Sequence, residues 1–214
     1  MSTIKIFKFF EYIHRMTYII RWSLMDCRKQ EDLKQHSFDV AMISHALIVI
    51  HNDVLELPRK LDAAKAALLA MYHDASEIFT GDVPTPIKYF GGGAMKGILD
   101  KIEGLAVDKL VSSLPDKMQP AYRDALDIKA EYKPYIKAAD RLAALRKCRE
   151  ELAAGNQEFA PAAARLEETL KASGMSEVDY FMANFMTDKP MSLDSLIGGN
   201  GAWLIEEEVS HDRI

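Results

Sequence analysis

Two histidines and two aspartates, in three separate segments of the chain, have side chains that could bind a metal ion. His36 stands at the start of an apolar stretch, and Asp140 interrupts the apolar pattern of YIKAADRLAALRKC. His73 and Asp74 are adjacent in LLAMYHDASEIFTGD. Helical spacing places each of them on an inward, otherwise apolar face, where an unpartnered charge is costly to bury. Imidazole and carboxylate groups together favour a divalent transition metal such as manganese, cobalt, zinc or iron, with water in the open positions.

Each of these residues also has a purely structural interpretation. His73 alone would be typical of a hydrogen-bonded histidine in a protein core, and His36 could cap its helix. Asp140 could pair with Arg141 or Arg21. The occurrence of all four at inward positions favours one metal site over four separate structural roles.

The segment that contains His73 is predicted to be a helix over 61–79, because it is rich in alanine and leucine. In such a helix, Leu69, His73 and Glu77 form a row along one face. Glu77 would then lie one turn beyond His73. A carboxylate in that position can orient or deprotonate a water, or protonate a leaving oxygen.

Hydrophobic periodicity predicts helices nearly throughout the chain. The predicted helices cover 7–20, a segment that begins at His36 and has Val40, Ile43 and Leu47 on one face, 61–79, 95–113, 116–130, 134–154, 160–173 and 176–186. Gly81 is suited to end the third helix, and Pro84 and Pro86 prevent its continuation. No run of alternating β-branched residues predicts a strand. We therefore expect an all-α fold, a single helical bundle over residues 1–197.

The order His36, His73-Asp74, Asp140 resembles the H…HD…D signature of the HD-domain metal-dependent phosphohydrolases. The chain is more closely similar to the YfbR-like 5′-deoxynucleotidases, a bacterial branch that removes phosphate from deoxyribonucleoside 5′-monophosphates. The segments that carry this resemblance are Arg21-Trp22, EDLKQHS, AMYHDASEIFTGDVPTPIKYF, KAADRLAALRKCREELAAGNQEF and VDYFM. The resemblance runs over residues 7–197 and implies a helical, homodimeric, cytoplasmic enzyme that needs one divalent metal ion.

By that resemblance, the metal ligands are expected to be His36, His73, Asp74 and Asp140. Glu77 is expected to be the catalytic carboxylate beside the metal. Cobalt or manganese is expected as the activating ion, with zinc, iron and copper as alternatives. Two-metal members of the superfamily typically add histidines between the HD pair and the final aspartate. This chain has no histidine between Ala75 and Ala139, which predicts a single catalytic metal.

The same resemblance implies the substrate contacts. Arg21 is expected to act in catalysis by orienting the phosphate, and a planar guanidinium can donate two hydrogen bonds to phosphate oxygens. Trp22 is expected to form a rigid apolar wall against the sugar, where a 2′-hydroxyl would be disfavoured. Further substrate contacts are expected from His36, Asp74, Asp82, Val83, Pro84, Thr85 and Lys88. The chain departs from the family pattern at Gly91–Gly93 and in its C-terminal tail.

The implied reaction is hydrolysis of deoxyribonucleoside 5′-monophosphates to deoxynucleosides and phosphate. A divalent metal suits this reaction because it offsets the phosphate charge that repels a nucleophile. Two alternatives stay open: a phosphohydrolase of the same superfamily that acts on a cyclic nucleotide or a triphosphate, and a non-catalytic nucleotide-binding protein. A triphosphate would call for more basic side chains than Arg21 and Lys88, and the presence of Glu77 weighs against a non-catalytic protein.

The composition is consistent with a small-molecule enzyme. The chain has 214 residues, and its 27 lysines and arginines against 32 aspartates and glutamates give a formal net charge of −5. This balance argues against a nucleic-acid polymer or an anionic membrane as a partner. No stretch reaches the roughly 20 apolar residues of a membrane-spanning helix. The two cysteines have no metal-type or redox spacing, which favours a reduced, cytoplasmic environment.

Residues 198–214 differ in character from the rest of the chain. Their glycines and the run Glu206–Glu208 are typical of a loosely held terminus, and a Trp203 docked at a subunit interface is the alternative. Four further histidines share no geometry that predicts a functional role, and these are His14, His45, His51 and His211.

Overall fold

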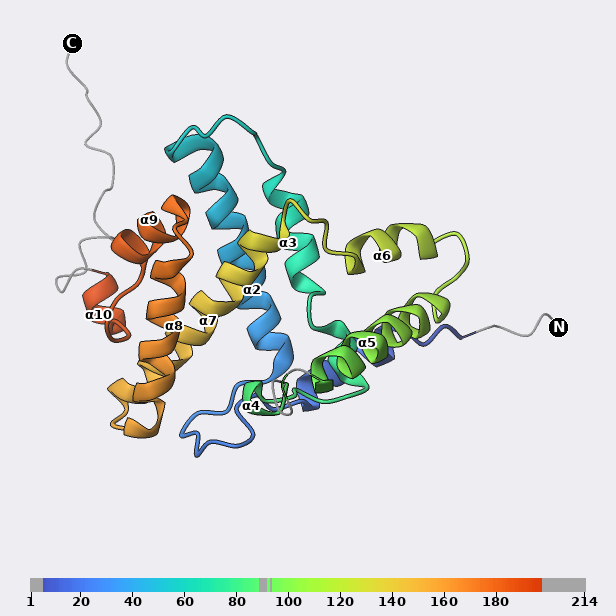
Figure 1. Ribbon diagram of the computed structural model, residues 1–214, viewed down its shortest axis with the longest axis horizontal. Helices are drawn as coiled ribbons and strands as arrows, with labels where there is room; N and C mark the ends of the chain where they lie inside the picture. The colour runs from blue at the N-terminus through green and yellow to red at the C-terminus, as the bar shows by residue number, and fades with distance from the viewer. Residues whose placement is uncertain (1–5, 89–91, 93, 198–214) are drawn as a thin grey trace, which may run out of the picture.

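The alanine- and leucine-rich stretches of the chain fold into helices that surround one long central helix, α2 (Figure 1). The computed structural model describes residues 6–88, 92 and 94–197. The α-helices are α1 (Phe9–His14), α2 (Leu33–Val49), α3 (Ala63–Met71), α4 (Thr85–Lys88), α5 (Ala94–Ser112), α6 (Gln119–Leu126), α7 (Lys133–Ala153), α8 (Ala160–Ala172), α9 (Ser176–Phe185) and α10 (Leu193–Leu196). Among these described residues, the β pairing is limited to a single bridge between Ile20 and Asp32. The expected all-α fold is confirmed.

Helix α2 begins three residues earlier than the sequence predicts. The Asp32 side chain accepts hydrogen bonds from the backbone amides of Lys34 and Gln35, at 2.9 and 2.8 Å, and the Gln35 side chain accepts one from the backbone amide of Asp32 at 3.4 Å. This reciprocal capping satisfies amides that would otherwise lack partners at the start of the helix. His36 therefore lies inside the helix and does not cap it.

The single helix predicted over 61–79 is wrong, because α3 ends at Met71 and a separate 3₁₀ turn, η3, covers Ala75–Ile78. The backbone amide of His73 donates to the carbonyl of Ala70, three residues back, at 3.3 Å. The His73 ring also lies 2.7 Å from that carbonyl, through Nδ1. These contacts tighten the chain into a turn, so His73 and Glu77 do not share one regular helical row.

The first predicted helix, 7–20, is also too long. Helix α1 ends at His14, and a 3₁₀ turn, η1, follows over Arg15–Tyr18. The C-terminal predictions are more accurate, because α5, α7, α8 and α9 begin and end within two residues of the predicted boundaries, whereas α6 is shorter than 116–130. The short helices α4 and α10 were not predicted.

Buried apolar side chains form two clusters. The larger cluster joins α2, α3, α7, α8 and α9, and the smaller one joins the N-terminal segment to η3 and α5. On α2, His36 lies between Leu33 of the smaller cluster and Val40 of the larger one. Burial of each large apolar side chain contributes about 1.5–3 kcal/mol, so both clusters hold the elements on either side of this junction in place. His36, one of the expected metal ligands, therefore lies where the two apolar clusters meet.

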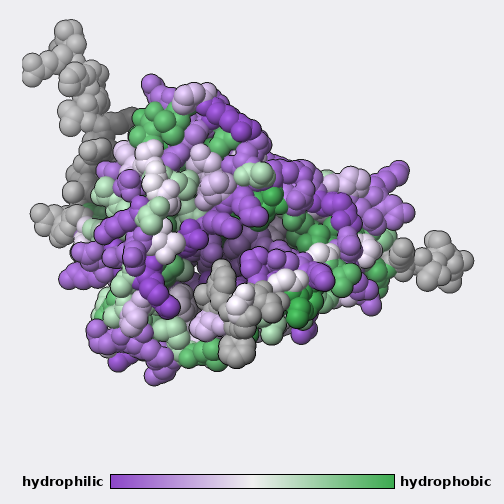
Figure 2. All heavy atoms as spheres, viewed as in Figure 1, coloured by the Kyte–Doolittle hydropathy of each residue, from purple (hydrophilic) through white to green (hydrophobic). Residues whose placement is uncertain are grey.

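Within the described residues, no helix is long and apolar enough to cross a membrane. Hydrophobic and hydrophilic atoms alternate in small groups over the face seen in Figure 2, which is hollowed near its centre. The C-terminal tail, including Trp203 and His211, lies outside the described residues, as do Gly91 and Gly93. The predicted boundary at residue 197 stays a prediction.

Candidate active site

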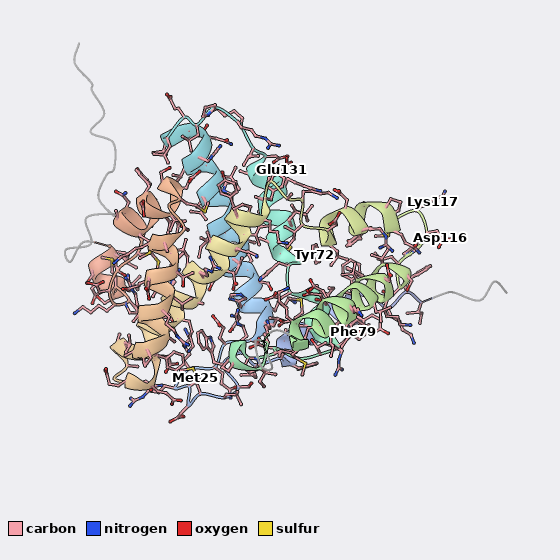
Figure 3. The ribbon with its side chains drawn as sticks, in the orientation of Figure 1. Met25, Tyr72, Phe79, Asp116, Lys117 and Glu131 are labelled. Atoms are coloured by element: carbon pink, nitrogen blue, oxygen red, sulfur yellow. The ribbon has the colours of Figure 1, made fainter. Side chains whose placement is uncertain are left out.

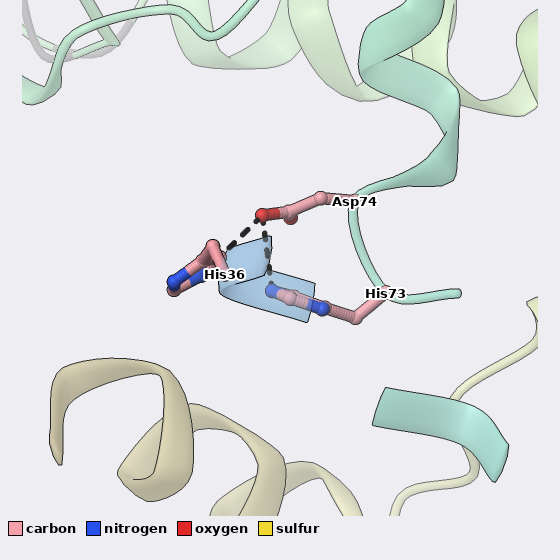
Figure 4. A group of neighbouring side chains, drawn as sticks. All are labelled: His36, His73 and Asp74. Atoms are coloured by element: carbon pink, nitrogen blue, oxygen red, sulfur yellow. Dashed lines mark ion pairs between the residues drawn. The ribbon is translucent and has the colours of Figure 1, made fainter. Parts of the chain in front are cut away.

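Three of the four expected metal ligands meet between α2 and the turn after α3. His36 projects from α2 and is completely buried, and His73 and Asp74 follow α3 directly. Oδ2 of Asp74 lies 3.0 Å from Nε2 of His73 and 3.9 Å from Nε2 of His36 (Figure 4). One ligand atom from each of the three residues falls within 4.8 Å of the others.

Asp140 joins this group from α7. Its Oδ1 lies 3.1 Å from Nε2 of His36, and about two fifths of its side chain, 43%, is exposed. The three elements that carry the four residues pack closely against one another, and the alanines beside Asp140 and His73 belong to the larger core cluster. The side chain of Asp140 thus closes one side of the group while leaving a path to solvent.

The residues present fit a divalent metal ion. A carbonyl oxygen only accepts, so Nδ1 of His73 carries the proton that bonds Ala70, and Nε2 is the nitrogen that can offer a lone pair to a metal ion once its own proton has left. Nε2 of His36 and Nε2 of His73 are buried, and neither has a hydrogen-bond partner within the described part of the chain. Buried polar atoms without partners are costly, and convergent imidazole and carboxylate groups are a ligand set for divalent transition metals.

The charges of the group support one another. Burial raises the pKa of Asp74, but His73, His36 and Arg21 outweigh it and hold that pKa well below its usual range. Burial lowers the pKa of His73, yet Asp74 and Asp140 raise it to about 9. The carboxylates are therefore ionised at neutral pH. A divalent cation would take the place of the His73 proton, because a metal-bound imidazole must be neutral.

Glu77 lies next to this group in η3. Only 13% of its side chain is exposed, Oε1 is 3.4 Å from Nζ of Lys88, and Oε2 has no hydrogen-bond partner in the described residues. Burial and the neighbouring Asp74 charge raise the pKa of Glu77 to about 8, against the opposing effect of Lys88. A carboxyl group with a pKa near neutrality can both take up and release a proton during turnover.

Arg21 and Trp22 lie in the loop between η1 and α2, and neither of them lines the cavity beside the ligand group. The guanidinium charge of Arg21 acts to lower the pKa of Asp74 and of Glu77. Nε and Nη1 of Arg21 are buried and make no hydrogen bond to the described residues. These donors are suited to the oxygens of a phosphate group. Trp22 packs against Phe159, with ring centroids 5.3 Å apart.

A cavity of about 170 Å³ opens beside the metal-type group. On one side it is lined by His73, Asp74, Ser76, Glu77, Thr80, Val83 and Lys88. The opposite wall belongs to α5 and consists of Lys96, Leu99, Asp100 and Glu103. This volume and the charged side chains in the lining suit a small polar molecule more than a large apolar ligand.

The expected pocket segment is only partly seen in this lining. Val83 lines the cavity, whereas Asp82 and Pro84 are half-buried beside it. Asp82 still influences the site, because its charge contributes to the raised pKa of Glu77. The Thr85 side chain lies outside the described residues. Lys88 lies at the cavity, where the sequence placed a phosphate contact.

Sequence reasoning missed Glu31 and the α5 wall. Glu31 contacts both Arg21 and Trp22, and nothing in its spacing distinguishes it from other surface carboxylates. In the sequence, the residues of the α5 wall are typical of the charged, solvent-facing side of an amphipathic helix. Their approach to His73 follows from the packing of α5 against η3, which no local pattern encodes.

Comparisons with known proteins give a consistent result. Residues 8–189 match the family model described as 5′-deoxynucleotidase YfbR-like. Over 191 residues the chain is 46% identical to 5′-deoxynucleotidase ECA3034 of Pectobacterium atrosepticum and 44% identical to 5′-deoxynucleotidase YfbR of Escherichia coli, in each case covering 88% of this chain and 94% of the relative.

Solved structures share the fold at low sequence identity. An HD-domain phosphohydrolase from Listeria innocua aligns with a TM-score of 0.69 and 21% identity, covering 92% of both chains. The HD phosphohydrolase DatZ of cyanophage S-2L, solved with dA and one catalytic Zn²⁺ ion, aligns with a TM-score of 0.54 and 17% identity, covering 81% of this chain and 93% of that one.

Proposed function

This chain belongs to the YfbR-like 5′-deoxynucleotidase family, and from that premise we propose that it hydrolyses deoxyribonucleoside 5′-monophosphates to deoxynucleosides and phosphate. The observation that carries the proposal is the convergence of His36, His73, Asp74 and Asp140 at the edge of a small cavity that also contains Glu77. The relatives named as 5′-deoxynucleotidases match almost the whole described chain, which supports the same substrate class.

In this proposal the four ligand residues hold one divalent ion. Two neutral imidazoles and two carboxylates would leave the ion with net charge close to zero and with positions for water and substrate. When bound, the ion would supply positive charge that stabilises the phosphoryl oxygens and acidifies water. Cobalt or manganese is the proposed activator, and zinc, iron and copper are the alternatives that the same ligands accept.

The side chains of the protein perform the remaining steps. Arg21 donates hydrogen bonds to the phosphate from Nη1, which makes no hydrogen bond to the described residues, and holds the phosphorus in line with the attacking water. Glu77 accepts the proton of that water, or returns a proton to the departing 5′-oxygen of the nucleoside. Lys88, 3.4 Å from Glu77, adds positive charge at the phosphate side of the cavity. Trp22 forms the wall beside the deoxyribose.

A phosphate-release assay tests the proposal directly. The purified protein is stripped of metal, reloaded with Co²⁺ or Mn²⁺ and incubated with deoxy- and ribonucleoside 5′-monophosphates, a cyclic nucleotide and a nucleoside triphosphate. We expect release from the deoxyribonucleoside monophosphates, with less from the ribonucleotides. Faster turnover of the cyclic nucleotide or the triphosphate would redirect the assignment within the superfamily. Metal binding with no turnover of any substrate would reject enzymatic function.

We also propose that the enzyme acts as a homodimer in the cytoplasm. The two cysteines, Cys27 and Cys148, are both free thiols, which is typical of a reducing compartment. Exposed apolar side chains on α2, Phe38 and Met42, provide surface that a second copy could cover. Light scattering after gel filtration measures the mass in solution, and a monomer mass at micromolar concentration would contradict the dimer.

A further inference from the structure

The loop that contains Arg21 and Trp22 has its two ends joined by backbone hydrogen bonds. The amide of Arg21 donates to the carbonyl of Glu31 at 3.0 Å, and the amide of Leu33 donates to the carbonyl of Ile19 at 2.9 Å. Residue 21 and residue 31 therefore face each other across the loop. This backbone pairing brings their side chains into contact.

The carboxylate of Glu31 contacts both expected substrate-binding residues with one oxygen. Its Oε2 lies 3.6 Å from Nε of Arg21, and it accepts a hydrogen bond from Nε1 of Trp22 at 3.2 Å. The side chains of Arg21 and Glu31 are each only 12% exposed. Because water has little access, the charge attraction and the hydrogen bond are stronger here than on an open surface.

Trp22 needs this restraint because its backbone is unusual. Its φ angle is +61°, in the left-handed region that side chains other than glycine rarely adopt. The indole is held between Glu31 and the ring of Phe159. A strained residue persists only where its surroundings over-determine it, so loss of the Glu31 contact should release the indole.

The rest of the loop is fastened independently of Glu31. The amides of Arg28 and Lys29 donate to the buried carboxylate of Glu151, and Asn156 donates to the carbonyl of Asp26. Met25 of the same loop lies near the start of α8 (Figure 3) and packs against the larger core cluster. A change at Glu31 is therefore expected to leave the loop in place and to alter only the two side chains that it touches.

We propose that Glu31 is a positioning residue that sets the guanidinium of Arg21 and the indole of Trp22 with one carboxylate, and so couples phosphate binding to discrimination against ribonucleotides. This inference rests on the proposed deoxynucleotidase function. Glu31 touches neither the metal ligands nor the reacting atoms, and it acts through the two side chains that do contact the substrate.

The test uses Glu31→Gln and Glu31→Ala in the metal-loaded full chain. The glutamine keeps an oxygen for Nε1 of Trp22 but removes the charge that faces Arg21, whereas alanine removes both contacts. For Glu31→Gln we expect KM for a deoxyribonucleoside monophosphate to rise with little change in kcat. For Glu31→Ala we expect KM to rise further and the deoxy-to-ribo ratio of kcat/KM to fall about tenfold.

A second readout does not depend on turnover. The chain has two tryptophans, Trp22 and Trp203, so a Trp203→Phe background makes fluorescence a report on Trp22 alone. In that background, Glu31→Ala is expected to increase quenching by acrylamide, and Glu31→Gln to increase it less. Unchanged quenching in Glu31→Ala would overturn the proposed hold on the indole.

Glu150→Gln is the matched control. Glu150, on α7, and Glu31 both line a second cavity of about 280 Å³, and Glu150 pairs with Lys29 and Arg146. The control should retain wild-type KM, selectivity and quenching. If the wild type prefers deoxyribonucleotides and Glu31→Ala leaves the deoxy-to-ribo ratio of kcat/KM unchanged, the proposed coupling of phosphate binding to sugar selectivity is wrong. If the wild type hydrolyses no deoxyribonucleotide, the proposed function fails, and the quenching result still decides whether Glu31 holds Trp22.

Discussion

His36 and His51 lie on one continuous rod, formed by α2 and the π-helical turn that extends it over Ile50–Val54, yet their surroundings differ sharply. Both side chains are buried and both lie next to a carboxylate. They are separated by 15 residues, about 20 Å along a helix. The comparison shows how one helix supports two polar clusters with different purposes.

Both ring nitrogens of His51 have hydrogen-bond partners. Nδ1 of His51 lies 2.6 Å from Glu177 and Nε2 lies 2.7 Å from the carbonyl of Arg59. The Tyr135 hydroxyl donates to Glu177 at 3.3 Å, and burial together with the Glu177 charge raises the pKa of Tyr135 to about 12. This cluster joins the π-helical turn after α2 to α7 and α9, and it leaves neither ring nitrogen of His51 available to a ligand.

The His36 cluster is left incomplete by the protein alone. Neither ring nitrogen of His36 makes a hydrogen bond to the described residues, and the same holds for Nε2 of His73 and Oε2 of Glu77. Such orphaned buried atoms cost stability unless a ligand supplies the missing partner. Ring nitrogens that are both hydrogen-bonded within the protein thus indicate a structural role, and convergent buried atoms that make no hydrogen bond indicate a binding site.

The largest expected effect is loss of activity in His36→Ala. Since changes in the outer shell of a metal site already cost about 10–100-fold, loss of a direct ligand is expected to lower kcat/KM by more than about a hundredfold. The metal content, measured by mass spectrometry of the dialysed protein, should fall in parallel, while the free energy of unfolding without metal changes little. Full metal content in this variant would contradict the assignment of His36.

The next largest effect is expected for Glu77→Gln, which should lower kcat without changing metal or nucleotide binding. Glu77→Gln preserves the shape of the side chain but removes its ability to exchange a proton, so kcat is expected to fall by about 10²–10⁴-fold. Metal content and nucleotide affinity, measured by calorimetry, should stay near wild type. Wild-type kcat would mean that another group handles the proton.

His51→Ala should show the reverse pattern. Removal of the imidazole leaves the buried carboxylate of Glu177 without its main partner, and the free energy of unfolding is expected to fall by about 3 kcal/mol. Chemical denaturation measures this change, with the exposed His14→Ala as the control. Metal content should be unaffected in the folded fraction. If His51→Ala lowers the free energy of unfolding no more than His14→Ala does, His51 does not have the structural role that distinguishes it from His36.

The smallest expected effect concerns the other self-satisfied cluster, around Glu151 on α7. Burial raises the pKa of Glu151, but Lys147, Asn156 and two backbone amides outweigh it and lower that pKa from 4.5 to about 2. A lowered folded-state pKa means that this carboxylate stabilises the fold above pH 4.5 and that the contribution is lost as the pH falls towards 2. Glu151→Gln should therefore cost about 2 kcal/mol at pH 7.

The difference between wild type and Glu151→Gln should shrink between pH 4.5 and 2. Denaturation curves across that range measure it, and Glu150→Gln, at the half-buried neighbouring position of α7, is the reference. A difference that stays constant down to pH 2 would show that the ionised carboxylate is not what stabilises the loop.

Much of the fold could be predicted because local sequence controls it. Pro134 stands at the second position of α7, Pro161 at that of α8, and Gly155 and Gly174 have the positive φ angles that end helices. The boundaries of these helices follow from such local signals. The break after Met71 could not be predicted, because it depends on the His73 ring and the Ala70 carbonyl and has no proline or glycine to mark it.

The candidate site divides in the same way. The residue types His36, His73, Asp74 and Asp140, together with the resemblance they carry, identified a metal-dependent phosphohydrolase family from the sequence alone. Their distances, the wall contributed by α5, and the position of Glu31 against Arg21 and Trp22 depend on packing between segments far apart in the chain. The chemical type of each side chain is known from the sequence alone. Which groups are left unpaired in a closed interior is decided only when the helices pack, because pairing is a property of the assembled neighbours.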